Sequence, residues 1–75
     1  MVHVDSEAID EIRYDASTST LFVRFAHGGW YGYFDISPAI HQAFVSAESH
    51  GRFFHRHIRD RFRFRRFESP PSTPR

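Results

Sequence analysis

Residues 20–34 read Thr20-Leu21-Phe22-Val23-Arg24-Phe25-Ala26-His27-Gly28-Gly29-Trp30-Tyr31-Gly32-Tyr33-Phe34. Residues 20–26 and residues 30–34 alternate their side chains between two faces and are rich in β-branched and aromatic types, as strands are. Gly28 and Gly29 lie between them and accept the positive φ that a hairpin turn requires. The stretch therefore predicts two antiparallel strands joined by a tight turn at residues 27–29.

A third strand is expected on the N-terminal side of this hairpin. Residues 8–14 look extended because Ile12 and Tyr14 share a face, whereas Ile9 is out of phase and indicates a β-bulge or a later start. Residues 15–19 have the composition of a turn. Together these segments predict three antiparallel strands in chain order.

The hydrophobic period changes after the third strand. Ser37 is a favourable helix N-cap, and Pro38 suits the first helical turn, where its missing N–H is no loss. Residues 38–49 place apolar side chains at positions i, i+3, i+4 and i+7, a stripe that can lie on the sheet. These apolar residues are Ile40, Ala43, Phe44 and Ala47. We expect Gly51 to end this helix as its C′ residue.

A second, shorter helix is expected after Gly51. Phe54 and Ile58 are four residues apart and can bury one face of it. Its opposite face would then carry Arg52, Arg56 and Arg59. Residues 61–67 return to alternation and predict an extended segment that could form an edge strand, and residues 68–75, rich in proline and serine, predict a disordered tail.

The fold class expected from this order is α+β. It consists of a three-stranded antiparallel sheet followed by two helices packed on one face, with room for a short C-terminal edge strand. The 75 residues suit a single domain, which we place at residues 1–67. There is no cysteine, no N-terminal leader pattern and no apolar run near the roughly 18 residues of a membrane span. We therefore expect a soluble, cytoplasmic protein that does not enter a membrane.

Charge is divided unevenly along the chain. Residues 1–35 hold six acidic residues and two arginines, and residues 36–75 hold three acidic residues and eight arginines, so the net charge of +1 hides halves of −4 and +5. Every basic residue is arginine, which binds phosphate with two parallel hydrogen bonds and stacks on planar groups. The alternative explanation for the absence of lysine is a general coding preference for arginine, without any role in binding.

The basic residues are concentrated in residues 51–67, where they alternate with phenylalanines. Seven arginines in this segment can meet phosphates, while five phenylalanines can meet bases or fill the core of a small domain. The alternative interpretation is a solvated charged face with a structural role for every ring. The candidate nucleic-acid contacts are Arg52, Arg56, Arg59, Arg61, Arg63, Arg65 and Arg66.

Aromatic residues of the predicted third strand are the candidates for base stacking. Tyr31 and Tyr33 share one face and lie about 7 Å apart by strand geometry, a spacing on which bases can stack. The alternative is that both rings cover the sheet beneath the helices. Trp30 and Phe22 would then lie on the other face and could offer an exposed aromatic pair.

The histidines and hydroxyl residues show no pattern of a catalytic or metal site. His55 and His57 are two residues apart and would point away from each other on a helix, and neither His41 nor His50 completes a set of ligands. With no activated nucleophile and no phosphate-binding glycine loop, we expect a non-enzyme without cofactor or metal and infer no small-molecule substrate.

The order of residues from 6 to 67 resembles a known family. The matching positions are Ser6, Ile9, Ile12, Tyr14-Asp15, Thr20-Leu21, Val23, Phe25, Gly29, Tyr31-Gly32-Tyr33, Phe44, Ser49, Gly51, Phe53-Phe54 and Ile58-Arg59. They resemble the KTSC domain, a short module named for the C-terminus of some lysyl-tRNA synthetases and also found as stand-alone bacterial proteins. The synthetase association implies a role in RNA binding. His55 and Arg61-Phe62 depart from the family pattern and make this chain more basic.

Two functional hypotheses from different classes follow. The first is a module that binds nucleic acid, RNA in preference to DNA, through the seven arginines of residues 52–66 with help from Tyr31, Tyr33 or Trp30. The second is a protein-interaction or self-association module, in which the basic half of one copy meets the acidic half of another in a homodimer. A membrane-surface role is weaker, because no broad apolar face accompanies the arginines.

Overall fold

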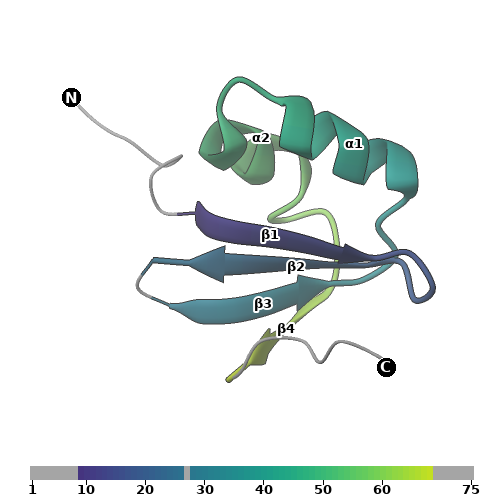
Figure 1. Ribbon diagram of the computed structural model, residues 1–75, viewed down its shortest axis with the longest axis vertical. Helices are drawn as coiled ribbons and strands as arrows, with labels where there is room; N and C mark the ends of the chain where they lie inside the picture. The colour runs from purple at the N-terminus through teal and green to yellow at the C-terminus, as the bar shows by residue number, and fades with distance from the viewer. Residues whose placement is uncertain (1–8, 27, 69–75) are drawn as a thin grey trace.

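The computed structural model describes residues 9–26 and 28–68. Ala8, His27 and residues 69–75, which the sequence analysis assigned to a strand, a turn and a tail, lie outside the described residues. The elements follow one another as β1 (Ile9–Asp15), β2 (Thr20–Phe25), β3 (Gly29–Tyr33), α1 (Pro38–Ser46), α2 (His50–His57) and β4 (Phe64–Phe67). The strands form one antiparallel sheet in the order β1-β2-β3-β4, and both helices cover one of its faces (Figure 1). The α+β class and the edge strand expected from the sequence are confirmed.

The β1–β2 pairing contains a bulge, which was one of the two alternatives left open for Ile9. Ile9 pairs with Phe25 and Glu11 pairs with Arg24, so β1 has one residue more than its partner over this interval. From Ile12 onward the register is regular and places Ile12 opposite Val23. The phase change at Ile9 therefore reflects this bulge.

A hydrogen-bonded turn connects β1 to β2. The Asp15 carboxylate accepts hydrogen bonds from the Ser17 hydroxyl at 2.6 Å and from the Ser17 backbone N–H at 3.0 Å. These bonds favour the charged carboxylate and lower the pKa of Asp15 below its ordinary value, against a smaller opposing effect of desolvation. Ser19 adopts a positive φ of 56° at the end of the turn.

The first helix begins where the sequence predicted and ends earlier. The Ser37 hydroxyl accepts a hydrogen bond from the Ile40 backbone N–H, and Pro38 occupies the first helical position. The helix stops after Ser46 because Ala47 is extended, with φ −69° and ψ 148°. The predicted end at residue 49 was therefore wrong.

Gly51 does not end the first helix. It is a buried residue within the first turn of α2, and Ser49 is the N-cap of that helix, its hydroxyl accepting from the Arg52 backbone N–H at 3.2 Å. The predicted burial of Phe54 and Ile58 is confirmed, since these residues are 4% and 0% exposed. The second helix therefore starts earlier than expected and ends with Ile58 as its C-cap.

The main core lies between the helices and the sheet. Its buried members come from β2, β3, the β3–α1 link and both helices: Leu21, Val23, Tyr33, Ile36, Phe44, Phe54 and Ile58. Tyr14 adds a polar connection by donating from its hydroxyl to the Ile36 carbonyl at 2.6 Å, and its ring stacks on His41. Pro38–Ser46 and His50–His57 are thereby fixed over β1, β2 and β3 (Figure 1).

A smaller aromatic cluster occupies the sheet face away from the helices. Register places Phe22 opposite Gly32 and Trp30 opposite Phe67 on this face. The Phe22 and Phe67 rings meet edge to face with centroids 5.5 Å apart, and the Arg13 guanidinium lies 5.3 Å from the centroid of the Trp30 ring. The contact between Phe22 and Phe67 joins β4 to β2 across this face.

The C-terminal extended segment is shorter than residues 61–67. The Arg61 N–H donates to the Ile58 carbonyl in a turn, and pairing with β3 begins only where the Phe34 N–H donates to the Arg63 carbonyl. Alternation from residue 61 predicted the strand correctly from Phe64 onward, while residues 61 and 62 complete the turn that follows α2.

Candidate nucleic-acid interface

The arginine segment, residues 52–66, runs over α2, the turn after it and β4. All seven of its arginines are exposed. Arg52 and Arg56 lie one turn apart on α2, but α2 ends before Arg59, so the expected helical stripe of three arginines holds for only these two. Arg59 and Arg61 follow the helix, and Arg63 precedes β4.

Three of these arginines are gathered at the C-terminal end of α2. The Arg61 Nε donates to the Arg56 carbonyl at 3.2 Å, and an Arg59 guanidinium nitrogen lies 3.1 Å from His55 Nδ1. Positive side chains are favoured there because the last carbonyls of a helix carry partial negative charge. The local structure therefore fixes the side chains of Arg59 and Arg61 near the last turn of α2.

The two arginines of β4 do not share one face of the sheet. Arg65 pairs with Gly32 and Arg66 pairs with Tyr31, and these successive positions point to opposite faces. The arginine segment thus reaches both sides of the β4 edge. A flexible anion could therefore contact arginines on both faces of the sheet at the β4 edge.

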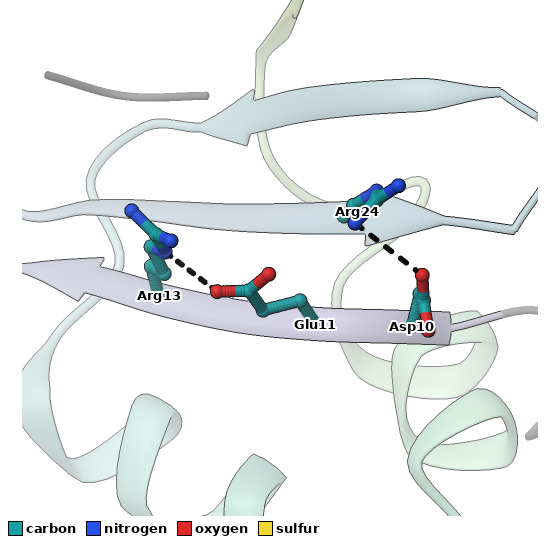
Figure 2. A network of polar contacts seen from close by, with 4 residues as sticks. All are labelled: Asp10, Glu11, Arg13 and Arg24. Carbon is teal, nitrogen blue, oxygen red and sulfur yellow. Dashed lines mark hydrogen bonds and ion pairs between the residues drawn. The ribbon is translucent and has the colours of Figure 1, made fainter. Parts of the chain in front are cut away.

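No arginine of the arginine segment forms an ion pair with an acidic residue in the part of the chain that the structure describes. Within residues 9–26 and 28–68, ion pairs join only Arg13 to Glu11 at 2.7 Å and Arg24 to Asp10 at 3.5 Å. Figure 2 shows both pairs, which join residues of β1 and β2. The positive charge of residues 52–66 is therefore available to an external anion.

Tyr33 is a core residue. It is 4% exposed, and its ring packs against Phe54 and Phe64 with centroids 5.2 and 5.3 Å away. Burial raises the pKa of the Tyr33 hydroxyl to about 12, with a smaller contribution from the neighbouring Tyr31. Of the two interpretations left open by the sequence, the structural one holds for Tyr33, whose ring offers no free face to a base.

Trp30 is also buried, which corrects the expectation of an exposed aromatic pair. It lies on the same side of the sheet as Phe22, as expected, but it is 4% exposed. Tyr31 is half-buried between contacts with Phe25 and Phe64. The proposed stacking platform on β3 is therefore reduced to part of the Tyr31 ring.

An apolar groove between the two helices was not found by sequence reasoning. It has a volume of about 330 Å³ and is lined by Ala39, Ile40, Ala43, Phe53, His57, Arg61 and Phe62. Phe53 and Phe62 were visible in the sequence as rings without an assigned face. The groove depends on the angle at which α1 packs against α2. This angle cannot be predicted from the hydrophobic periodicity of either helix.

The histidines are dispersed. His41 stacks on Tyr14, the His50 ring is near the Val45 carbonyl, and His57 contacts Phe53. In the part of the chain that the structure describes, histidine, aspartate and glutamate form no group of three that could hold a metal ion. Neither helix of that part has the length and apolar composition needed to cross a membrane.

These features define a class: a small α+β module with two helices on one face of a four-stranded antiparallel sheet and an exposed arginine segment at its C-terminal side. The family model that matches residues 5–62 is that of the KTSC domain. The chain belongs to the KTSC domain family. A solved KTSC domain protein of Yersinia pestis superposes with a TM-score of 0.80 at 38% identity, covering 85% of this chain and 90% of that one.

Relatives of this chain occur both as short proteins and within synthetases. A protein of Tsukamurella paurometabola is 36% identical over 63 residues, covering 84% of this chain and 94% of that protein. A lysine–tRNA ligase of Trichormus variabilis is 34% identical over 75% of this chain, and one of Nostoc punctiforme is 30% identical over 80%. The match covers only 10% and 11% of these two ligases.

Proposed function

We propose that this KTSC domain is a non-enzymatic, cytoplasmic module that binds nucleic acid through the arginine segment. The observation that carries the proposal is the exposure of seven arginines within residues 52–66, none of which forms an ion pair with another described residue. RNA is preferred to DNA because two relatives of this chain are lysine–tRNA ligases.

Phosphate binding is the chemistry that this segment supports. Each guanidinium can donate two parallel hydrogen bonds to a phosphate, and the release of condensed counterions makes such binding strongly dependent on salt. If about four arginines contact phosphates, log affinity falls against log salt concentration with a slope of about −3 to −4. Contacts of this kind position the ligand without reading its sequence.

The test compares two neutralised arginines by fluorescence anisotropy with a labelled single-stranded RNA over a salt series. Arg63→Gln should lower the affinity for every sequence and reduce the salt slope by about one. Arg24→Gln is the matched control, because it removes the same charge from an exposed arginine outside the segment. Binding that is absent, independent of salt, or equally weakened by both substitutions contradicts the proposal.

A further inference from the structure

We infer that the groove between α1 and α2 binds one unstacked base of a single-stranded nucleic acid, next to phosphates held by the arginine segment. This inference rests on the proposed function and makes it more specific. It assigns base contact to the inter-helix groove instead of to the tyrosines of β3, and it predicts a preference for single strands over duplexes.

The shape of the groove suits a single planar ring system. Its volume of about 330 Å³ lies at the small end of the range of ligand pockets. Ala39 and Ala43 of α1 are exposed and have short side chains, so this wall of the groove is low. Half-buried Ile40 supplies an apolar surface beside them.

The opposite wall consists of aromatic rings. The Phe53 ring stacks on the fully buried Phe44 with centroids 5.6 Å apart, and its other close ring contact is His57 at 4.6 Å. Phe53 and Phe62 are half-buried and His57 is exposed, so part of each ring faces solvent in the groove. Stacking on such rings is how proteins bind splayed bases irrespective of sequence.

Arg61 connects the groove to the phosphate-binding surface. It lines the groove and also belongs to the arginine segment, and its Nε is fixed by the hydrogen bond to the Arg56 carbonyl. A base inserted beside Phe62 therefore has its own phosphate near Arg61. This continuity of an apolar groove with arginines that form no ion pair with other described residues favours a nucleotide of a chain over an uncharged apolar ligand.

The inference excludes duplex as the ligand of the groove. Bases in a duplex are stacked and paired, and extracting one costs a few kcal/mol. A single strand already exposes its bases. We therefore expect a single-stranded oligonucleotide to bind better than a duplex with the same number of phosphates.

The experiment compares a short single-stranded RNA with an oligonucleotide of the same length that has abasic sugars throughout. Both carry the same phosphates, and only the first carries bases. The native domain should bind the RNA about tenfold more tightly, because stacking of one base contributes this much. Ala43→Leu fills the groove from an exposed helical position and should lower RNA affinity to the abasic level without changing abasic affinity.

A second leucine variant on α1 is the control. Gln42→Leu adds similar apolar surface at an exposed position that does not line the groove, and RNA affinity should stay unchanged. Equal binding of both oligonucleotides, or no effect of Ala43→Leu while Arg63→Gln still weakens binding, overturns the groove inference alone. Absence of any binding overturns the proposed function as well.

Discussion

Gly32 is the residue on which the packing of the uncovered sheet face depends. A Cβ at this position would lie 2.8 Å from Phe67 Cε1 and 3.2 Å from Phe22 Cε1, where those two rings meet edge to face. A missing side chain on β3 therefore lets rings from both neighbouring strands approach each other across it. The Tyr-Gly-Tyr sequence combines two rings that face the helices with a gap that accepts two rings on the other side.

Gly32→Ala is expected to destabilise the domain by about 1–3 kcal/mol, the usual cost of overpacking a filled site. The new methyl group must displace Phe67 and loosen β4, which carries Arg65 and Arg66. Urea unfolding monitored by Trp30 fluorescence measures the loss. Gly28→Ala is the control, because its Cβ would lie at ordinary contact distances of 3.7 and 3.8 Å. Equal stability of the two variants would show that the ring contact at Gly32 is dispensable.

At the residue scale, the sequence predicted features that depend on neighbours along the chain. Ser37 was identifiable as an N-cap because a proline follows it, and Ile9 indicated a bulge because it broke a local alternation. The burial of Trp30 was not predictable, because Arg13 from another strand lies over its ring. Phe67 contributes to the same face only after β4 has paired with β3.

The junction between α1 and α2 is where element boundaries were misread. Ala47 is extended, and Ser49 caps the second helix after a link of only a few residues. The sequence analysis placed the end of the first helix at Gly51 because glycine commonly ends helices. In the structure the Ser49 hydroxyl accepts a hydrogen bond from the Arg52 N–H, and α2 therefore begins directly after Ser49. Competing local signals of similar strength decide such boundaries, and periodicity alone does not rank them.

Ser49→Ala should therefore weaken α2 by about 1 kcal/mol, the typical contribution of an N-cap side chain. The expected result is a lower urea midpoint with an unchanged slope, together with faster amide exchange of the Arg52 N–H. Ser46→Ala is the matched control, since Ser46 is exposed at the end of α1 and caps neither helix. Identical midpoints for the two variants would mean that packing of Phe54 alone positions the helix.

The same scale explains why the groove escaped sequence reasoning. Strands and helices were predictable because each has its own period, and their order fixed the α+β class. The groove requires three separate segments: residues 39–43 of α1, Phe53 and His57 of α2, and the turn at Arg61 and Phe62. Which rings line the groove depends on how the helices pack. The candidate base contacts inferred from the structure therefore lie in this groove and not on β3, where the sequence analysis placed them.

Across the whole molecule, three acidic residues of the described N-terminal half interact with other residues of the same chain. Glu11 and Asp10 pair with Arg13 and Arg24 on the sheet, as Figure 2 shows, and the Asp15 carboxylate binds the Ser17 N–H and hydroxyl in its turn. Such exposed pairs add little stability, but they neutralise the local field. The charge asymmetry read from the sequence thus becomes an exposed basic segment, while Asp10, Glu11 and Asp15 of the opposite half have partners within their own chain.

The edges of the sheet oppose self-association by strand pairing. One edge is β1, which is bulged near its start and carries exposed Asp10 and Arg13, and the other is the short β4 with Arg65 and Arg66. Bulges, short length and charge are the features by which natural sheets avoid pairing edge to edge. These edges therefore disfavour a homodimer formed by pairing of the two sheets edge to edge.

We accordingly expect the domain to remain monomeric in solution. Light scattering over a wide concentration series should give the mass of one chain, 8.9 kDa, at low and at moderate salt.

Pairing of a basic with an acidic surface would contradict this expectation. The measured mass would then rise with concentration at low salt, and this rise would disappear at higher salt because salt screens the charges. In that case a second copy of the domain would cover the arginine segment, and Arg63→Gln would reduce this association. If the domain is monomeric, Arg63→Gln reduces only RNA binding. Salt-insensitive association would indicate edge pairing or the apolar groove as the contact, and Ala43→Leu would distinguish these by disrupting only the latter.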